Sequence, residues 1–225
     1  DFAVFRPSTN VWWITTSSNS SYYSVTFGSS GDLPAVADYD GDGKADLAVF
    51  RPSEGNWYIR RSIDNALQTI RFGSVGDKPV AADFDGDTIA DIAVYRPSTG
   101  VWYILRSLDG QFIIRQFGIS EDKTVAADYD GDGKADIAVW RPSTGVWYVL
   151  RSSDDDFRAV AWGLPADLPV IGDYEGDVTV AGERITGPHP SVGMVFQEES
   201  TFPWRTVVEN VAFPLEIEGM NKAKR

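Results

Sequence analysis

The chain has no cysteine and a single histidine among its 225 residues. Disulfides are therefore excluded, and zinc and copper, which prefer thiolate or imidazole ligands, are poor candidates for any metal site. His189 stands between two prolines without a visible catalytic partner, which favours a solvated loop residue over a general base. The sequence also lacks an apolar run long enough to cross a bilayer, so we expect no membrane insertion.

Positive charge is scarce as well, because the formal net charge is −13. Without a basic stripe to neutralise phosphates, binding to nucleic acid is disfavoured. What the sequence does contain is aromatic residues, which make up 13% with eight tryptophans, together with many glycines and prolines. This composition favours short strands and turns over helices.

One acidic stretch, residues 128–136, dominates the pattern. Its carboxylates fall at the first, third, fifth and ninth places, which are Asp128, Asp130, Asp132 and Asp136. Four carboxylates held in one turn repel each other unless a cation lies between them. Oxygen ligands alone, with the backbone carbonyl of Lys134 at the seventh place added, suit Ca²⁺, which takes 6–8 oxygens.

The stretch recurs every 45 residues, beginning at Asp38, Asp83, Asp128 and Asp173. A period of this length is typical of propeller blades or solenoid units. The seventh place is Lys44 in the first loop and Ile89 in the second, so the same carbonyl ligand is expected there. An aspartate-rich hairpin turn without metal, held by Asx-turn hydrogen bonds, is the alternative.

Each unit contains four short segments with strand composition, and an Arg-Pro-Ser turn follows the first of them. We therefore predict an all-β fold of four 45-residue, four-stranded propeller blades over residues 1–174. One tryptophan recurs in every unit, and we expect these side chains to pack between blades rather than bind a ligand: Trp12, Trp57, Trp102 and Trp147. The recurring Arg6, Arg51, Arg96 and Arg141 could bind an anion, but pairing with a neighbouring aspartate or carbonyl is favoured.

These units resemble FG-GAP or VCBS-type repeats, the family that builds the integrin alpha-subunit propeller and many bacterial surface proteins. The resemblance covers residues 1 to about 174, although Gly-Asp-Leu-Pro or Gly-Asp-Lys-Pro stands in place of the literal Gly-Ala-Pro. It implies calcium binding by the aspartate loops. The implied ligands are Asp38, Asp40, Asp42 and Asp46, then Asp83, Asp85, Asp87 and Asp91, then Asp128, Asp130, Asp132 and Asp136.

The pattern breaks after Asp173, since Ala181 occupies the ninth place of the fourth loop. Residues 175–225 predict a short α/β fragment, with a hairpin at 176–187, a strand at 192–196 and helical spacing at 206–218. This tail is similar to ATP-binding subunits of ABC transporters of the nitrate, sulfonate and taurine importer type, on the runs 193–198, 202–204 and 206–213. Gln197 matches the Q-loop glutamine of that family.

The tail lacks the parts that phosphoryl transfer requires. No Gly-Lys-Ser/Thr phosphate loop and no Leu-Ser-Gly-Gly-Gln signature occurs in the chain, and no Walker B acid is found. We therefore expect no enzyme activity. Because the two resembled families belong on opposite sides of a membrane, a fused or chimeric chain explains the combination better than one evolved function.

The whole pattern predicts a calcium-binding repeat module of an extracellular or cell-surface protein. Such a module would serve as a binding or adhesion scaffold for a protein or glycan ligand. The alternatives are an ATP-binding fragment of an ABC importer, a propeller-type enzyme or a structural spacer. An enzyme should show an irregular cluster of histidines, acids or nucleophiles, and residues 1–173 show none. Asp1 begins in mid-motif, matching Asp46, so we expect a fragment that does not include its signal peptide.

Overall fold

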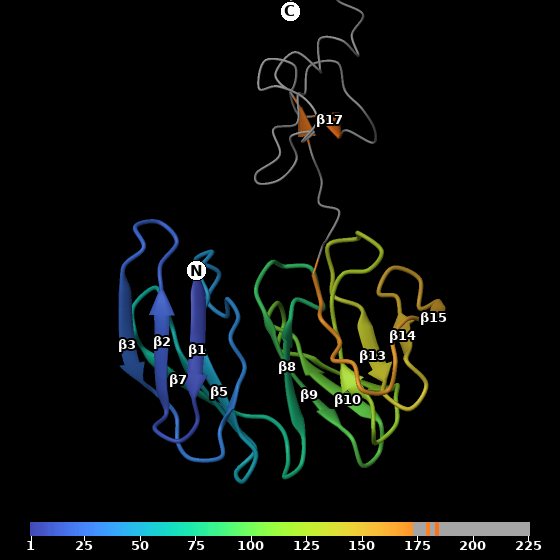
Figure 1. Ribbon diagram of the computed structural model, residues 1–225, viewed down its shortest axis with the longest axis horizontal. Coiled ribbons are helices and arrows are strands. Elements are labelled where there is room, and N and C mark those ends of the chain that lie inside the picture. The colour runs from blue at the N-terminus through green and yellow to red at the C-terminus, as the bar shows by residue number, and fades with distance from the viewer. Residues whose placement is uncertain (173–178, 181–182, 185–225) are drawn as a thin grey trace, which may run out of the picture. The chain divides into compact units, whose positions relative to one another are not determined.

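The computed structural model describes residues 1–172, 179–180 and 183–184 (Figure 1). Every regular element among these residues is a β-strand, so the predicted all-β class is confirmed for them. The chain divides into two units, Asp1–Ile171 and Gly172–Arg225. None of the described residues forms a helix of the length and apolarity that a membrane span requires.

The first unit consists of four antiparallel sheets. Sheet one contains β1 (Phe2–Arg6), β2 (Val11–Thr15) and β3 (Tyr22–Thr26). Sheet two contains β4 (Leu33–Pro34), β5 (Leu47–Arg51), β6 (Asn56–Arg60) and β7 (Leu67–Arg71). Sheet three contains β8 (Lys78–Ala82), β9 (Asp91–Arg96), β10 (Val101–Leu105) and β11 (Phe112–Gln116). Sheet four contains β12 (Lys123–Thr124), β13 (Ile137–Arg141), β14 (Val146–Leu150) and β15 (Phe157–Ala161).

The sheets are out of phase with the sequence units. The short strand that ends each unit pairs with the first strand of the following unit, as β4 pairs with β5 through Leu33 opposite Phe50 and Pro34 opposite Val49. Sheet one therefore has three strands instead of the four that the sequence predicts. The physical reason is that the aspartate loop is itself a hairpin connection, which brings the strands on its two sides together.

The turn after Arg-Pro has a glycine with positive φ in three of the four repeats, at Gly55, Gly100 and Gly145, and Asn10 in the first. Gly55 has φ +71° and donates its N–H to the carbonyl of Arg51 at 2.9 Å. A Cβ at this position would collide with the carbonyl oxygen of Gly73. The absence of a Cβ at Gly55 permits this close approach, which ties the β5–β6 turn to the end of β7.

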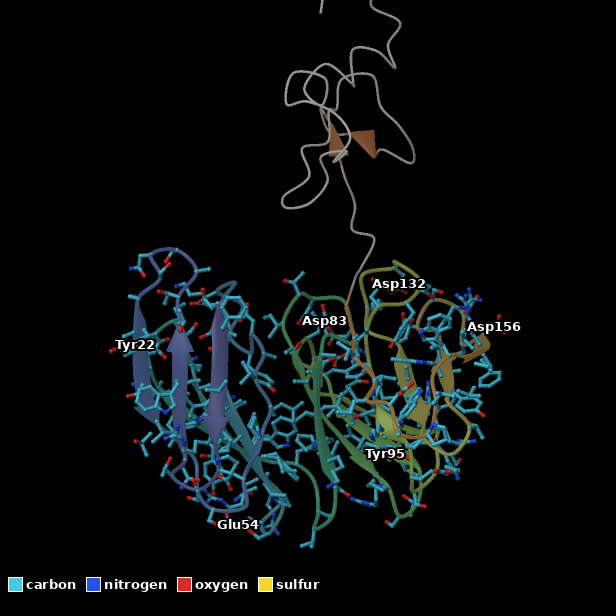
Figure 2. The ribbon with its side chains drawn as sticks, in the orientation of Figure 1. Tyr22, Glu54, Asp83, Tyr95, Asp132 and Asp156 are labelled. Carbon is cyan, nitrogen blue, oxygen red and sulfur yellow. The ribbon has the colours of Figure 1, made fainter. Side chains whose placement is uncertain are left out.

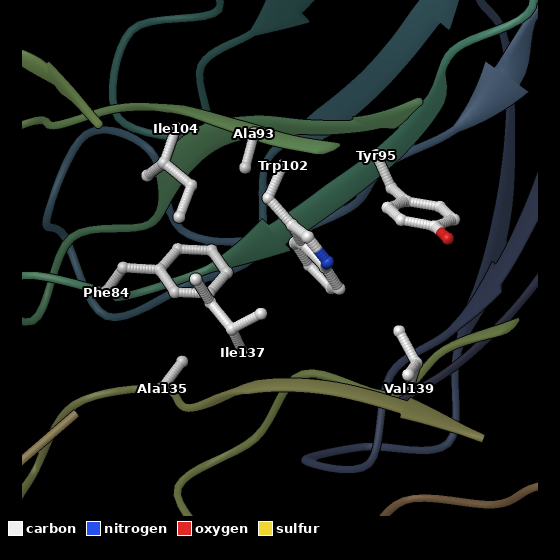
Figure 3. Close-up of a cluster of buried hydrophobic side chains, with 8 residues drawn as sticks. All are labelled: Phe84, Ala93, Tyr95, Trp102, Ile104, Ala135, Ile137 and Val139. Carbon is white, nitrogen blue, oxygen red and sulfur yellow. The ribbon is translucent and has the colours of Figure 1, made fainter. Parts of the chain in front are cut away.

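The core lies between successive sheets. Trp102 of sheet three is 0% exposed and shares a cluster with Tyr95 of its own sheet and with Ile137 and Val139 of sheet four (Figure 3). Its Nε1 donates to the carbonyl of Phe117 at 2.8 Å, which satisfies the one polar group of the buried ring.

The other tryptophans of this position repeat the arrangement. Trp12 and Trp57 are 2% and 0% exposed, and their Nε1 atoms donate to the carbonyls of Phe27 and Phe72. A packing role is confirmed for these residues. Trp147 makes the equivalent bond to Trp162 but is only partly buried, because no further sheet covers it among the described residues.

Three of the recurring arginines pair with a buried aspartate from the segment between sheets. Arg51 donates from Nε and Nη2 to the two carboxylate oxygens of Asp32, at 2.8 and 3.1 Å. The same two-point contact joins Arg96 to Asp77 and Arg141 to Asp122. This fork geometry holds the segment that enters each sheet against the end of its second strand, so the favoured structural role of these arginines is confirmed.

In the second unit, β16 (Thr179–Val180) pairs with β17 (Glu183–Arg184) in antiparallel fashion. This pair falls within the hairpin predicted at 176–187. The strand predicted at 192–196 and the helix predicted at 206–218 lie outside the described residues, so the predicted α/β fragment stays a prediction.

The unequal burial of the repeated tryptophans yields a test. Trp102→Ala should lower the free energy of unfolding by about 3–5 kcal/mol, because it removes a fully buried indole. Trp147→Ala is the matched control at the same place in the repeat and should cost clearly less, because its ring is partly exposed. Urea unfolding of both variants measures the difference, and equal losses would contradict the packing described above.

Candidate metal centres

The three complete aspartate loops are hairpin connections. Residues 38–46 join β4 to β5, residues 83–91 join β8 to β9, and residues 128–136 join β12 to β13. In Figure 2, Asp83 and Asp132 lie toward one end of the sheets, whereas Glu54, in an Arg-Pro-Ser turn, lies at the opposite end. The acidic loops are thereby gathered at one end of the first unit.

The first aspartate of each loop organises the turn. Asp38 accepts the N–H groups of Gly41 and Gly43 at 2.7 and 2.8 Å, one on each carboxylate oxygen. Asp83 and Asp128 accept the corresponding N–H groups of their own loops. Gly41 and Gly43 have φ of +78° and +81°, a region that suits glycine, so the loop sequence fits this geometry.

The ninth aspartate of each loop is buried in the sheet. Asp46 is 0% exposed and accepts the N–H of Tyr39 at 2.8 Å and that of Ser62 at 2.6 Å. Burial raises the pKa of the Asp46 carboxyl, and the negative charges of Asp40 and Asp38 add to this effect, while the two N–H donors oppose it. Asp91 and Asp136 repeat the burial, the two N–H bonds and the direction of the pKa shift.

Each loop brings three carboxylates together, with one oxygen from each lying within 4.8 Å of the others. The groups are Asp38, Asp40 and Asp42, then Asp83, Asp85 and Asp91, then Asp128, Asp130 and Asp136. Two ligands on opposite sides of a calcium ion lie about 5 Å apart, since each bond is about 2.3–2.6 Å long. The spacing of the carboxylates therefore fits one such ion in each loop.

One predicted aspartate in each loop stands outside its group. In the first loop it is Asp46, which makes the bonds given above. In the other two loops it is the fifth-place residue, Asp87 or Asp132, whose carboxylate accepts the hydroxyl of Ser107 or Ser152 at 2.8 or 2.9 Å. These carboxylates have protein donors on them already, so their part as ligands stays a prediction.

The seventh-place residues contribute N–H groups within the loop. Lys44, Ile89 and Lys134 each donate to the fifth-place aspartate, at 2.8 to 2.9 Å. The Nζ of Lys44 also lies 3.5 Å from Asp42, but its side chain is 74% exposed, so solvent screens this contact. The predicted ligation by the three carbonyl oxygens stays a prediction.

Sequence reasoning missed the serines that brace the loops from a neighbouring turn. Ser62, Ser107 and Ser152 each lie in the turn between the third and fourth strands of their sheet and donate an N–H to the ninth aspartate. Ser153 adds a hydroxyl bond to Asp130 at 2.6 Å. The 45-residue recurrence of these serines was the available signal.

Successive loops are also joined to each other. The N–H of Ala90 in the second loop donates to the carbonyl of Asp38 in the first, at 2.7 Å. The N–H of Ala135 in the third loop donates in the same way to Asp83, at 2.6 Å. Backbone hydrogen bonds therefore join the first aspartate loop to the second and the second to the third.

The second loop differs from the other two in backbone and in charge. Its sixth place is Thr88 at φ +72°, where Gly43 and Gly133 have +81° and +86°. The sixth place therefore has a positive φ in all three loops, and a β-branched residue is strained there. In addition, Nε of Arg106 lies 3.4 Å from a carboxylate oxygen of Asp85, so a positive side chain competes with any cation.

We predict that the second loop binds calcium most weakly and that Thr88→Gly strengthens binding there. Removing strain of about 1 kcal/mol corresponds to roughly a fivefold gain in affinity. Occupancy of each loop at limiting calcium, measured by anomalous scattering from crystals, checks the order of affinities. The reciprocal control is Gly133→Thr, which should weaken the third loop, and equal filling of all three loops in the unaltered chain would contradict the prediction.

Comparison with known families finds the FG-GAP-like repeat in residues 38–94 and again in residues 83–139. Residues 38–139 therefore carry FG-GAP-like repeats and include all three complete loops. The resemblance read from the sequence is confirmed over this range.

A second similarity, to ABC importers, is short. The chain is 48% identical over 48 residues to the nitrate import ATP-binding protein NrtD of Synechocystis sp. and to the taurine import ATP-binding protein TauB of Escherichia coli and Shigella sonnei. The match covers 21% of this chain and 18% or 19% of those proteins. The chain thus spans about a fifth of the length of these relatives, and the importer resemblance read from the sequence is confirmed as a partial match.

Proposed function

We propose that the FG-GAP-like repeats belong to a calcium-binding β-propeller module of an extracellular or cell-surface protein. One observation carries this proposal: three carboxylate oxygens within 4.8 Å of one another recur at the same place in three successive repeats. A single acidic cluster is common on protein surfaces, whereas a regular series with buried members requires a compensating charge.

The chemistry of the loops favours calcium over other cations. All candidate side-chain ligands are carboxylate oxygens, which are hard donors and suit Ca²⁺ or Mg²⁺. Magnesium demands near-ideal octahedral geometry and keeps several waters, whereas calcium accepts the irregular oxygen shell that a hairpin loop can offer. The burial of Asp91 and Asp136, which are 0% exposed, removes solvent from one side of each site and further favours the ion that releases its water more readily.

The stacked sheets support the propeller part of the proposal. Each sheet has three or four short antiparallel strands, and apolar clusters join sheet two to sheet three and sheet three to sheet four. This is the packing expected between the blades of a propeller. In such a scaffold the calcium loops hold the blade ends, and the remaining surface is available to a protein or glycan ligand.

Calcium should stabilise the protein by mass action. For sites with dissociation constants of about 10⁻⁴–10⁻³ M, calcium at about 10 mM contributes about 1.4–2.7 kcal/mol per site. The melting temperature should therefore rise in calcium and fall when a chelator is added. Differential scanning calorimetry measures the shift, and magnesium at the same concentration should have a smaller effect.

A set of variants separates ligation from general ionic effects. The combination Asp40→Asn, Asp85→Asn and Asp130→Asn alters one third-place carboxylate in each group and should abolish the calcium shift. Asp154→Asn changes an exposed turn aspartate outside the groups and should leave the shift intact. Identical melting of the unaltered protein in calcium and in chelator would overturn the metal proposal.

Nucleotide binding is the second function to consider, because 48 residues are similar to importer ATP-binding proteins. We propose that this function is not retained and that the chain binds no ATP, because the sequence has no Gly-Lys-Ser/Thr loop to surround the phosphates. Calorimetric titration with ATP and Mg²⁺ should show no saturable binding. ATP hydrolysis that Gln197→Ala abolishes would reverse this conclusion.

A further inference from the structure

The aspartate loops contact one another at residues beside their candidate ligands. Asp38 belongs to the carboxylate group of the first loop, and its backbone carbonyl accepts the N–H of Ala90 at 2.7 Å. Ala90 directly precedes Asp91, which belongs to the group of the second loop. The bond therefore joins a member of one group to the residue next to a member of the following group.

The second and third loops repeat this bond. The carbonyl of Asp83, a member of the second group, accepts the N–H of Ala135 at 2.6 Å. Ala135 directly precedes Asp136 of the third group, and the two residues are 8% and 0% exposed. Because an N–H group that is buried without a partner is costly, a movement of Asp83 that breaks the bond also destabilises the third loop.

A side-chain contact accompanies each of these bonds. The seventh-place side chain of one loop lies over the fourth-place glycine of the loop before it. A Cβ at Gly41 would lie 3.2 Å from Cγ1 and Cδ1 of Ile89, and a Cβ at Gly86 would lie 3.1 Å from Cγ and Cε of Lys134. Both glycines donate their N–H to the first aspartate of their own loop. The seventh-place side chain therefore packs on the turn that holds this aspartate.

These contacts link the shape of one loop to the shape of the next. The carboxylates of an empty loop repel one another, which favours a more open loop. When a cation holds the first-place aspartate, the carbonyl and the turn glycine beside it are held as well. They fix the seventh and eighth places of the following loop, directly before its ninth-place carboxylate. That carboxylate then loses less conformational entropy when its own loop is filled.

Charge acts in the opposite direction. An ion in one loop cancels part of the negative charge that attracts an ion to the adjacent loop, so charge alone lowers the second affinity. At about 0.15 M salt, however, exposed charges are screened over a Debye length of about 8 Å. The hydrogen bond and the packing contact are not screened in this way, and we expect them to determine the sign of the coupling.

We propose that adjacent aspartate loops of this chain bind calcium cooperatively, so that filling one loop raises the affinity of its neighbour. This coupling rests on the calcium binding proposed above and assigns positioning roles to residues whose side chains are not candidate ligands, namely Ile89, Ala90, Lys134 and Ala135. Coupled sites differ in affinity by about 5–150-fold, and the effect is the same in both directions. We expect at least about a fivefold effect, confined mainly to neighbouring loops because the contacts join neighbours.

Disabling the first loop tests the coupling. Asp40→Asn combined with Asp42→Asn removes two carboxylates of its group. The two remaining aspartates carry the same net charge as four aspartates with one Ca²⁺, so the charge of a filled loop is matched. The affinity of the second loop should fall at least about fivefold, and that of the third loop should change less. In an NMR titration of the full chain with calcium, the amide signals of Gly41, Gly86 and Gly131 report the filling of each loop.

Substitutions at the contacts separate packing from charge. Each variant is titrated with the neighbouring loop intact and disabled, and the ratio of the two affinities measures the coupling. Ile89→Ala should lose the coupling between the first and second loops. Ile63→Ala makes the same truncation at a turn residue that is 62% exposed and should keep it. Lys134→Ala should lose the coupling between the second and third loops, whereas Lys134→Met removes the charge, keeps a long side chain over Gly86 and should retain it.

The outcomes distinguish this coupling from calcium binding itself. Glycine signals that do not respond to calcium in the unaltered chain would overturn both. Calcium binding with a second-loop affinity that is unchanged or raised when the first loop is disabled would overturn the coupling alone. Coupling that survives both Ile89→Ala and Lys134→Ala, or that Ile63→Ala removes equally, would overturn the assigned contacts. Amide signals outside the loops show that the sheets of each variant are intact.

Discussion

The ends of the sheets depend on a buried aspartate that receives two backbone N–H groups. Asp46, Asp91 and Asp136 are each 0% exposed, and each connects its own loop to a neighbouring turn of the same sheet. Burying a carboxylate is costly unless hydrogen bonds and nearby charge compensate it. Two N–H donors provide part of this compensation, but the adjacent aspartates add negative charge. The loop is therefore held in shape by its backbone, while its carboxylates repel one another unless a cation lies between them.

The two ends of the first unit differ in how the charges of their aspartates are compensated. At the end with the Arg-Pro-Ser turns, each buried aspartate meets an arginine fork, as Asp77 meets Arg96 at 2.8 and 2.9 Å, and the charges cancel within the protein. At the loop end most carboxylates meet only N–H and hydroxyl groups, and the nearest cationic side chains are few, such as Arg106 near Asp85. This asymmetry places much of the uncompensated negative charge of residues 1–172 in the aspartate loops.

The sequence predicted the strands, the loops and the packing tryptophans because all three depend on local chemistry that repeats every 45 residues. The strain at Thr88 was also predictable, since glycine holds the same place in the other loops. The pairing of β4 with β5 was not, because the pattern shows where a strand lies but not which neighbour it joins. Nor could the pattern show which three aspartates converge, as this depends on side-chain rotamers. Ser62, Ser107 and Ser152 recur every 45 residues, but the recurrence alone does not show that their N–H groups reach an aspartate of the neighbouring loop.

The offset between sequence unit and sheet has a consequence for how such a chain can lengthen. Because Leu33 and Pro34 complete the sheet of the following unit, every boundary between units lies inside a sheet. A tandem duplication of any 45-residue window within residues 1–172 therefore inserts one whole sheet, one acidic hairpin and one arginine–aspartate bridge, wherever in this range the window begins. Recombination therefore needs no preferred breakpoint to keep the strands of each sheet in their pairing register. Arrays of different length can arise from a single ancestral segment without any new contact between unlike surfaces.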